Sequence, residues 1–285
     1  MVEIDAMTEL NLEIPNGLTL RTELSLRALR FAKTHGLVYE RTDGTVPGVL
    51  FAQDDNGCHG NFHPLSYQMI SSHAQWKLRL GKVHTAFKRS RARANWHWRE
   101  LDCAHSSDAL LMNIFCHPGV VTSAVVKAML GVESKTVPEF GFKPRIPLHN
   151  GKRDNTEIDM KLDQSLVEAK LTESDFQSAR FELISRYRDV VSVFDLSEIP
   201  CRNGRHCSYQ LIRGTLAAYA TGFSYCIFCD ARRPDLIEAW YRVMRAVRLV
   251  ELRYRLKLLT WQELAAVLPD DLQQFLAAKY GVVPA

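Results

Sequence analysis

Residues 156–170 read TEIDMKLDQSLVEAK, and polar and apolar side chains alternate on both sides of Asp163-Gln164. Alternation with a period of two is typical of β-strands. If Asp163 and Gln164 form a two-residue loop, the flanking strands make a hairpin in which Asp159 lies directly opposite Glu168. The other face then carries apolar residues that helices can cover, namely Ile158, Met160, Val167 and Ala169.

This hairpin brings two carboxylates close together. Directly opposed residues have Cβ atoms about 4.5–5.5 Å apart, and like charges placed there are destabilising. Asp159 and Glu168 therefore need a proton or a cation, and a hard divalent ion such as Mg²⁺ accepts carboxylate oxygens and can also contact a substrate phosphate. Lys170 shares this face with Glu157, where its ammonium can orient an attacking water or stabilise charge on a phosphate. The alternative is an exposed hairpin in which Lys170 only pairs with Glu157 or Glu168.

A second feature is a basic strip at residues 77–99. It contains eight Lys or Arg and no Asp or Glu, although the whole chain has a net charge of only +4. Aromatic residues interleave with these charges. Basic side chains displace counterions from phosphates, and aromatic rings can stack on bases, so the strip predicts a nucleic-acid partner. The expected contacts are Lys82, Lys88, Arg89, Arg91 and Arg93; a solvated basic helix face or loop is the alternative reading.

Length and composition place the chain among ordinary globular proteins. Its 285 residues, 46% of them hydrophobic, fit two domains or one large domain with an appended piece. No apolar run approaches the roughly 20 residues of a membrane helix. Seven cysteines, an odd number, favour free thiols over a disulfide framework. We therefore expect a cytoplasmic protein with no membrane contact.

The remaining pattern predicts a mixed α/β core from about residue 104 onward. Residues 1–75 show turn signals and little sustained periodicity. The expected elements are a capped helix starting at Ser106 or Ser107 and ending at His117-Pro118-Gly119, a helix over 122–130, strands and turns over 137–170, a helix over 174–187, a helix over 209–220, a strand over 223–229, a helix opening at Pro234, and a capping box at Thr260-Glu263.

Here the residues carry a resemblance. Asp159 followed by Glu168-Ala169-Lys170 after a strand hairpin resembles the PD-(D/E)XK nuclease superfamily, which has the restriction-endonuclease-like fold. The stretches 106–115 and 207–211 are similar to an uncharacterised bacterial branch of restriction-endonuclease-like proteins. The resemblance covers about residues 104–230. One position departs from the family pattern, because Ile158 stands where a proline would precede the aspartate.

The resemblance implies roles for individual residues. Asp159 and Glu168 would hold Mg²⁺, for which Mn²⁺ is expected to substitute, and Lys170 would assist the attacking water. Gln210 would steady the site or touch the DNA backbone. An acid on the first helix often completes the metal shell, and Asp108 is the nearest candidate, with Glu100 a poorer one.

Other cysteine and histidine groups give weaker signals. Cys58-His59 with His63, and Cys201 with His206 and Cys207, could each share a zinc ion, but neither has the paired spacing of a known zinc finger. Cys226 and Cys229 resemble a metal knuckle. Residues three apart on a strand point to opposite faces, so we expect a buried strand there instead.

These observations lead to one hypothesis. We expect an N-terminal region, residues 1–100, with a basic strip that contacts DNA, and a restriction-endonuclease-like core with a C-terminal helical extension, residues 101–285. The expected activity is that of a magnesium-dependent endodeoxyribonuclease acting on DNA, with a second copy of the chain or a partner protein left open. The alternatives are a catalytically inactive nucleic-acid-binding protein of the same fold and a nuclease subunit of a larger defence or mobile-element complex.

Overall fold

A five-stranded sheet forms the centre of the protein in the computed structural model, which describes residues 17–42, 48–83, 99–133 and 137–285. The strand order is β12-β11-β7-β6-β3. The pairs β3–β6 and β6–β7 are antiparallel, and the pairs β7–β11 and β11–β12 are parallel. The strands are β3 (Glu139–Phe142), β6 (Ile158–Leu162), β7 (Ser165–Ala169), β11 (Ser224–Cys229) and β12 (Leu256–Thr260).

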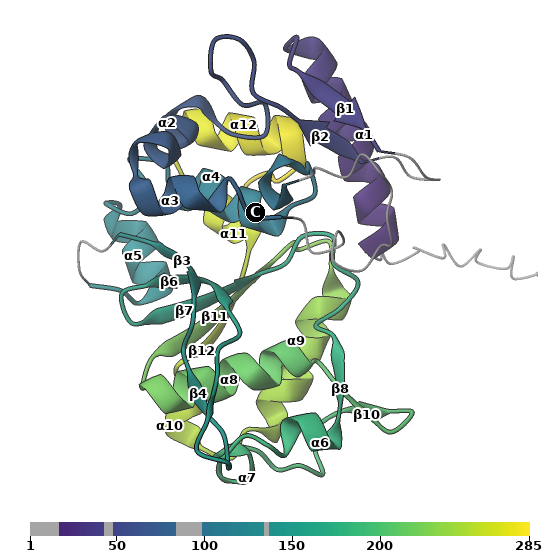
Figure 1. Cartoon of the computed structure of the whole chain (residues 1–285), viewed down its shortest axis with the longest axis vertical. Helices are drawn as coiled ribbons and strands as arrows, with labels where there is room; N and C mark the ends of the chain where they lie inside the picture. Colours follow the sequence, from purple (N-terminus) through teal and green to yellow (C-terminus); the bar gives the residue numbers. More distant parts are fainter. Residues whose placement is uncertain (1–16, 43–47, 84–98, 134–136) are drawn as a thin grey trace, which may run out of the picture.

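Helices cover both faces of this sheet (Figure 1). On one face lie α8 (Tyr209–Thr221), α9 (Pro234–Ala246) and α10 (Val250–Arg253), which contribute to the larger hydrophobic core. On the other face lie α4 (Ser107–Phe115), α5 (Ala124–Leu130), α11 (Trp261–Ala265) and α12 (Asp270–Tyr280). Because both faces of the sheet are covered, all five residues of β7 are buried, including the polar residues Ser165 and Glu168. The predicted mixed α/β fold with a central mixed sheet flanked by helices is confirmed.

The first 75 residues are more regular than expected. α1 (Gly17–Thr34) is an 18-residue helix, so the expectation of little periodicity was wrong there. Its buried residues, including Leu20, Leu24, Ala28 and Ala32, form a narrow stripe of four-residue spacing, whereas Leu18 and Leu26 are exposed. α1 packs against α12. The other elements of this part are β1 (Tyr39–Arg41), β2 (Val49–Phe51), α2 (Pro64–Ser72) and α3 (Ala74–Arg79).

The predicted helix over 174–187 is also wrong. The segment contains β8 (Ser178–Arg180) followed by a single helical turn, α6 (Phe181–Ile184). Gln177 has a φ of 60°, a left-handed conformation that interrupts a right-handed helix. β8 pairs instead with β10. Of the residues that suggested a helix stripe, Phe176, Ala179 and Tyr187 are buried, whereas Leu183 is exposed. The remaining short elements are β4 (Ile146–Pro147), β5 (Arg153–Asp154), α7 (Val190–Val193), β9 (Cys201–Arg202) and β10 (Arg205–Cys207).

The other expected elements are present with small shifts at their ends. Ser106 caps α4 by accepting a hydrogen bond from the Ala109 amide, and Thr260 and Glu263 form the predicted capping box. Cys226 and Cys229 pack into the cores on opposite faces of the sheet, as expected for a buried strand. Among the described residues, none of the helices combines the length and the apolar character that a membrane span requires.

Gly214 marks a close contact between α8 and β11. A Cβ atom at this position would lie 2.1 Å from Cζ of Tyr225, a fully buried side chain. Alanine favours a helix by about 1 kcal/mol over glycine, but overpacking costs about 1–3 kcal/mol or more. Because such a short contact belongs at the upper end of that range, we expect Gly214→Ala to lower the free energy of unfolding by about 2 kcal/mol in urea titrations.

A double mutant tests whether the ring of Tyr225 causes this loss of stability. In Tyr225→Ala the ring is gone, so adding Gly214→Ala should be neutral or stabilising, and the double-mutant cycle should show strong coupling. A Gly214→Ala protein as stable as the original chain would contradict the close packing of α8 on β11.

Candidate active site

The β6–β7 hairpin has the predicted register. Met160 pairs with Val167, Lys161 with Leu166 and Leu162 with Ser165, so Asp163 and Gln164 form the two-residue loop. Asp163 has a φ of 52°, in the left-handed region that aspartate tolerates better than most residues. The predicted loop and these three pairs are therefore confirmed, whereas the pairing does not continue to Asp159 and Glu168.

The regular pairing of the two strands ends before Asp159. Its Oδ2 accepts a hydrogen bond of 2.8 Å from the amide of Ala169, so the carboxyl group lies along β7 beside Glu168. The expected single apolar face is wrong in one residue. Met160, Val167 and Ala169 pack in one core, whereas Ile158 packs in the core on the opposite face of the sheet. Since helices cover both faces, an apolar residue is buried on either one.

One cavity collects the predicted catalytic residues. It has a volume of about 380 Å³ and lies where the end of β7 meets the first turns of α4 and α8. Lys82, from the basic strip, also contributes to the wall. The predicted residues that line it are Asp108, Asp159, Glu168, Lys170 and Gln210, and the poorer candidate Glu100 lines it as well.

Glu168 is the hub of the hydrogen bonds in this cavity. Its Oε1 accepts from Nζ of Lys170 at 2.8 Å and from Nε2 of Gln210 at 3.0 Å. The side chains of Glu168 and Lys170 are only 3% and 5% exposed, so this is a buried ion pair, not the exposed pair of the alternative reading. Gln210 lies in the first turn of α8, and its backbone N–H donates a hydrogen bond to the carbonyl oxygen of Phe176.

The backbone of Lys170 is fixed from two sides. Its amide donates to the carbonyl oxygen of Phe228 at the end of β11, and its carbonyl oxygen accepts a 2.8 Å hydrogen bond from Nε1 of Trp261. Trp261 is fully buried and stacks on the ring of Phe228. The lysine therefore stands on a rigid support, as a group that must meet a substrate atom requires.

Burial and like charge act on Asp159. Its pKa is raised well above the ordinary value by burial and then by the neighbouring carboxylates of Glu168 and Asp108. The two acids that the hairpin brings together therefore disfavour a second negative charge. This is the electrostatic cost that a divalent cation or a proton would relieve.

Lys170 experiences the opposite balance. Burial alone would lower the pKa of its ammonium, but the carboxylates of Glu168, Glu173 and Asp159 outweigh burial and raise it above the usual value. These carboxylates therefore favour the ammonium form, which can stabilise a negative charge nearby.

Asp108 is paired with cations from α3 and the residues after it. Its Oδ2 accepts from Nζ of Lys82 at 2.5 Å and from Nη2 of Arg79 at 3.3 Å. Nη1 of Arg79 donates to Glu157 at 3.2 Å. Glu157 was expected to face Lys170 across the hairpin, but it pairs with this arginine instead. Asp108 thus lies in the cavity wall, held by two positive charges.

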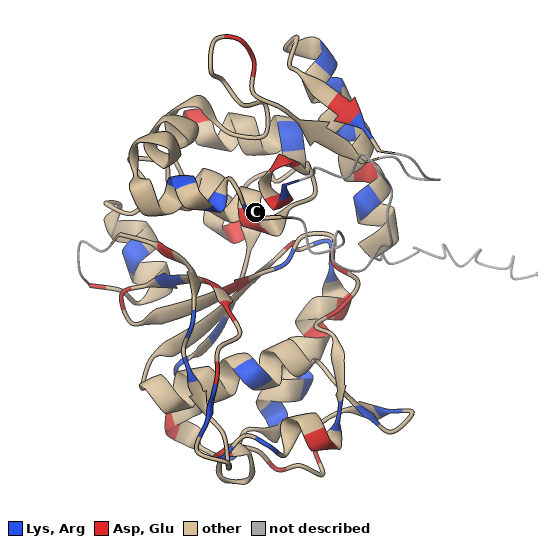
Figure 2. Cartoon of the chain, viewed as in Figure 1, with Lys and Arg blue, Asp and Glu red and all other residues tan. Residues whose placement is uncertain are grey.

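The predicted DNA-binding residues lie mostly outside the described parts of the chain, namely Lys88, Arg89, Arg91 and Arg93. Lys82, the one expected contact within those parts, lies at the cavity and is 29% exposed. Elsewhere in the described chain, Lys and Arg are spread over both helical layers (Figure 2). Within those parts, the positive charge nearest the candidate site comes from Arg79, Lys82 and Lys170.

The sequence reading missed Glu173. Its Oε2 accepts from the amide of Leu171 and its Oε1 from the hydroxyl of Ser107, both at 2.7 Å, so it joins the end of β7 to the start of α4. It also lines the cavity and helps to keep Lys170 charged. The sequence does show a glutamate three residues after Lys170. No periodicity predicts the turn that places its side chain at the cavity.

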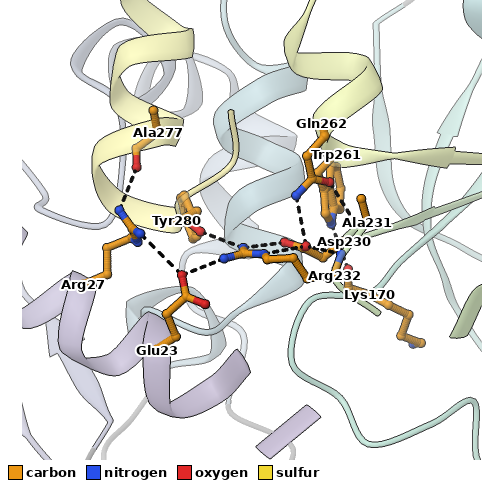
Figure 3. Close-up of polar contacts among 10 residues, drawn as sticks. All are labelled: Glu23, Arg27, Lys170, Asp230, Ala231, Arg232, Trp261, Gln262, Ala277 and Tyr280. Atoms are coloured by element: carbon orange, nitrogen blue, oxygen red, sulfur yellow. Dashed lines mark hydrogen bonds and ion pairs between the residues drawn. The ribbon is translucent and has the colours of Figure 1, made fainter. Parts of the chain in front are cut away.

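A buried polar network supports this side of the site (Figure 3). The carboxylate of Asp230, which is fully buried at the end of β11, accepts hydrogen bonds from Arg232 and Gln262. Arg232 continues to Glu23 in α1 and to the carbonyl oxygen of Tyr280 in α12. The network therefore joins both ends of the described chain to the strand beside Lys170.

Asp230→Ala should lower the free energy of unfolding by about 2–4 kcal/mol, because it leaves Arg232 and Gln262 without their buried acceptor. Glu238→Ala is the matched control, since it removes an exposed Arg–Glu ion pair and should cost less than about 0.5 kcal/mol. Equal losses for the two variants in chemical denaturation would show that the network contributes nothing to stability.

Comparisons with known proteins address the family. A search of curated proteins gave no match, and neither did a search of solved structures. One family model, REase-ARP, described as "Restriction Endonuclease associating with ARP", matches residues 28–281. That match spans nearly all of the 285 residues and contains every residue of the cavity. The chain therefore belongs to the REase-ARP family of restriction endonucleases.

Proposed function

We propose that this chain is a magnesium-dependent endodeoxyribonuclease of the PD-(D/E)XK type. The observation that carries the proposal is the convergence of Asp159, Glu168 and Lys170 in one cavity, with Gln210 bound to Glu168. Two carboxylates and a charged lysine are the groups that phosphodiester hydrolysis needs. Membership of a restriction-endonuclease family makes DNA the expected substrate.

The donor set fits a hard divalent cation. Both acids offer carboxylate oxygens, which Mg²⁺ prefers, and the raised pKa of Asp159 reflects a repulsion that a cation would relieve. When bound, Mg²⁺ would neutralise charge on the phosphodiester and favour ionisation of the attacking water. Asp159 and Glu168 would hold it. Asp108 would join them only if it exchanged its contacts with Lys82 and Arg79.

The protein's own side chains have distinct tasks. Lys170, held charged by the surrounding carboxylates, would stabilise the negative charge that develops on the phosphate during attack. Gln210 would orient the carboxylate of Glu168 through its hydrogen bond to Oε1. Lys82 and Arg79 at the cavity would attract the backbone of DNA, aided by the basic strip at residues 77–99.

Cleavage of supercoiled plasmid DNA tests this function. With Mg²⁺ or Mn²⁺ we expect nicked or linear products carrying 5′-phosphates, and with EDTA we expect none. Cutting that continues undiminished in EDTA would overturn the proposal. DNA binding that persists in EDTA, without cutting in any metal, would support the inactive DNA-binding alternative instead.

A partner protein is a second part of the proposal. The family description names an association with ARP, so we propose that the chain cuts together with such a partner. The pairing of Asp108 with two cations is consistent with a site that is completed on assembly. Plasmid cleavage measured with and without the partner would separate the two cases, because a self-sufficient enzyme gains no activity from it.

A further inference from the structure

Three potential metal ligands meet far from the nuclease cavity. His63 directly precedes α2, His117 follows α4, and Asp271 lies in the first turn of α12. Nε2 of His63 lies 3.6 Å from Oδ2 of Asp271, and Nε2 of His117 lies 3.4 Å from the same oxygen. Within the described parts of the chain, this is the one group of three such residues whose ligand atoms all lie within 4.8 Å of one another.

The two imidazoles are buried without adequate partners. His63 is 8% exposed and His117 is 4% exposed. Nδ1 of His63 has no hydrogen-bond partner among the described residues, and Nε2 of His117 has only the long contact of 3.4 Å with Asp271. Buried polar atoms are normally well satisfied, and a metal ion would replace this long contact of His117 by a direct ligand bond.

The chemistry of the cluster matches zinc. Histidine nitrogens and carboxylate oxygens are zinc ligands, and tetrahedral zinc keeps neighbouring ligand atoms about 3.3 Å apart. The separations of 3.4 and 3.6 Å are close to this value.

The cluster also has access to solvent. His63 and Asp271 lie in the wall of a cavity of about 870 Å³ that is otherwise largely apolar, and the side chain of Asp271 is half exposed. A metal held by three protein ligands there would keep a position open to this cavity. The nuclease residue Asp108 is in the first turn of α4, whereas His117 lies past the other end of that helix, so the two sites are separate.

We propose that His63, His117 and Asp271 bind one zinc-class divalent ion, which links three segments distant in the sequence. The sequence groups His63 with Cys58 and His59 as possible zinc ligands, but in the structure His63 lies beside His117 and Asp271, and His59 pairs with Asp102. At present the Gly119 amide lies 3.4 Å from Nδ1 of His117. Metal binding at Nε2 puts the ring proton on Nδ1, so we expect this long contact to be lost in the metal-bound protein.

Metal content of the full-length protein tests the proposal. After incubation with Zn²⁺ and dialysis, we expect about one retained ion per chain by mass spectrometry, and Co²⁺ should give visible absorption typical of tetrahedral coordination. His117→Ala and Asp271→Asn should lose both signals. Asp271 is half exposed, so its variant is expected to fold, which circular dichroism checks.

Two controls make the result specific. His149→Ala removes an exposed histidine and should keep the ion. Asp159→Asn alters the nuclease cavity and should also keep it, so the result does not depend on DNA cleavage. Absence of retained Zn²⁺ in the original chain, or full retention in both ligand variants, would overturn the proposal.

Discussion

Replacing Lys170 by Gln is expected to slow plasmid cleavage by about 10²–10³-fold, the usual loss when one donor to a developing negative charge is removed. Lys170 is buried, charged and hydrogen-bonded to Glu168. Glutamine can keep a hydrogen bond to Glu168 but carries no charge. The expected defect is therefore in the rate constant for cleavage, with little change in affinity for DNA.

The same hairpin supplies the matched control. Lys161 also forms an ion pair with a glutamate, Glu139, but at the opposite edge of β6 and outside the cavity. Lys161→Gln should cleave at the rate of the original protein. Equal rates for Lys170→Gln and the original protein, with both folded by circular dichroism, would remove the lysine from the mechanism.

Asp159→Asn is expected to slow cleavage by about as much as Lys170→Gln, about 10²–10³-fold. It is also expected to make the metal-free protein more stable. The asparagine oxygen can still accept the hydrogen bond from Ala169, so the hairpin is preserved. The substitution removes a carboxylate whose pKa is raised by burial and by Glu168 and Asp108. An increased melting temperature without metal, together with lost activity, is the signature of a functional site that lowers stability.

The raised pKa of Asp159 also makes the stability of the metal-free protein depend on pH. An acid with a pKa raised in the folded state contributes stability that is present below its unfolded pKa of about 3.9 and is lost as the pH rises through the folded pKa. Mg²⁺ should therefore raise the melting temperature more at a pH above the folded pKa of Asp159 than at a pH below it. In Asp159→Asn, this pH dependence of stability and this pH-dependent effect of Mg²⁺ should both be absent. Asp163→Asn, in the loop of the hairpin, should behave like the original chain. A Mg²⁺ shift of equal size in both variants would contradict this account.

Local patterns predicted the hairpin and the caps because each depends on a few neighbouring residues. Alternation around Asp163-Gln164 fixed the register of β6 and β7, and Ser106 marked the start of α4. The register then brought Asp159 and Glu168 together without any knowledge of the rest of the fold. The same alternation placed Lys170 on the face of that pair. The joining of Asp108 and Gln210 came from a family resemblance, since no spacing in the sequence specifies it.

Long-range contacts explain what the sequence reading missed. The segment around Gln177 has helical spacing but pairs with β10, because its backbone turns left-handed and the distant strand supplies partners. Glu173 and Lys82 reach the cavity through a turn and through α3, respectively, which no local period encodes. His63, His117 and Asp271 come from three distant segments, so their meeting is visible only in the folded chain.

The central claim is that Asp159 and Glu168 share a divalent cation. A crystal soaked with Mn²⁺ tests it most directly, since anomalous scattering locates the ion without knowledge of the substrate. We expect an anomalous peak bound by both carboxylates, and none there in Asp159→Asn. A map with manganese at other places and no peak between these two side chains would contradict the claim.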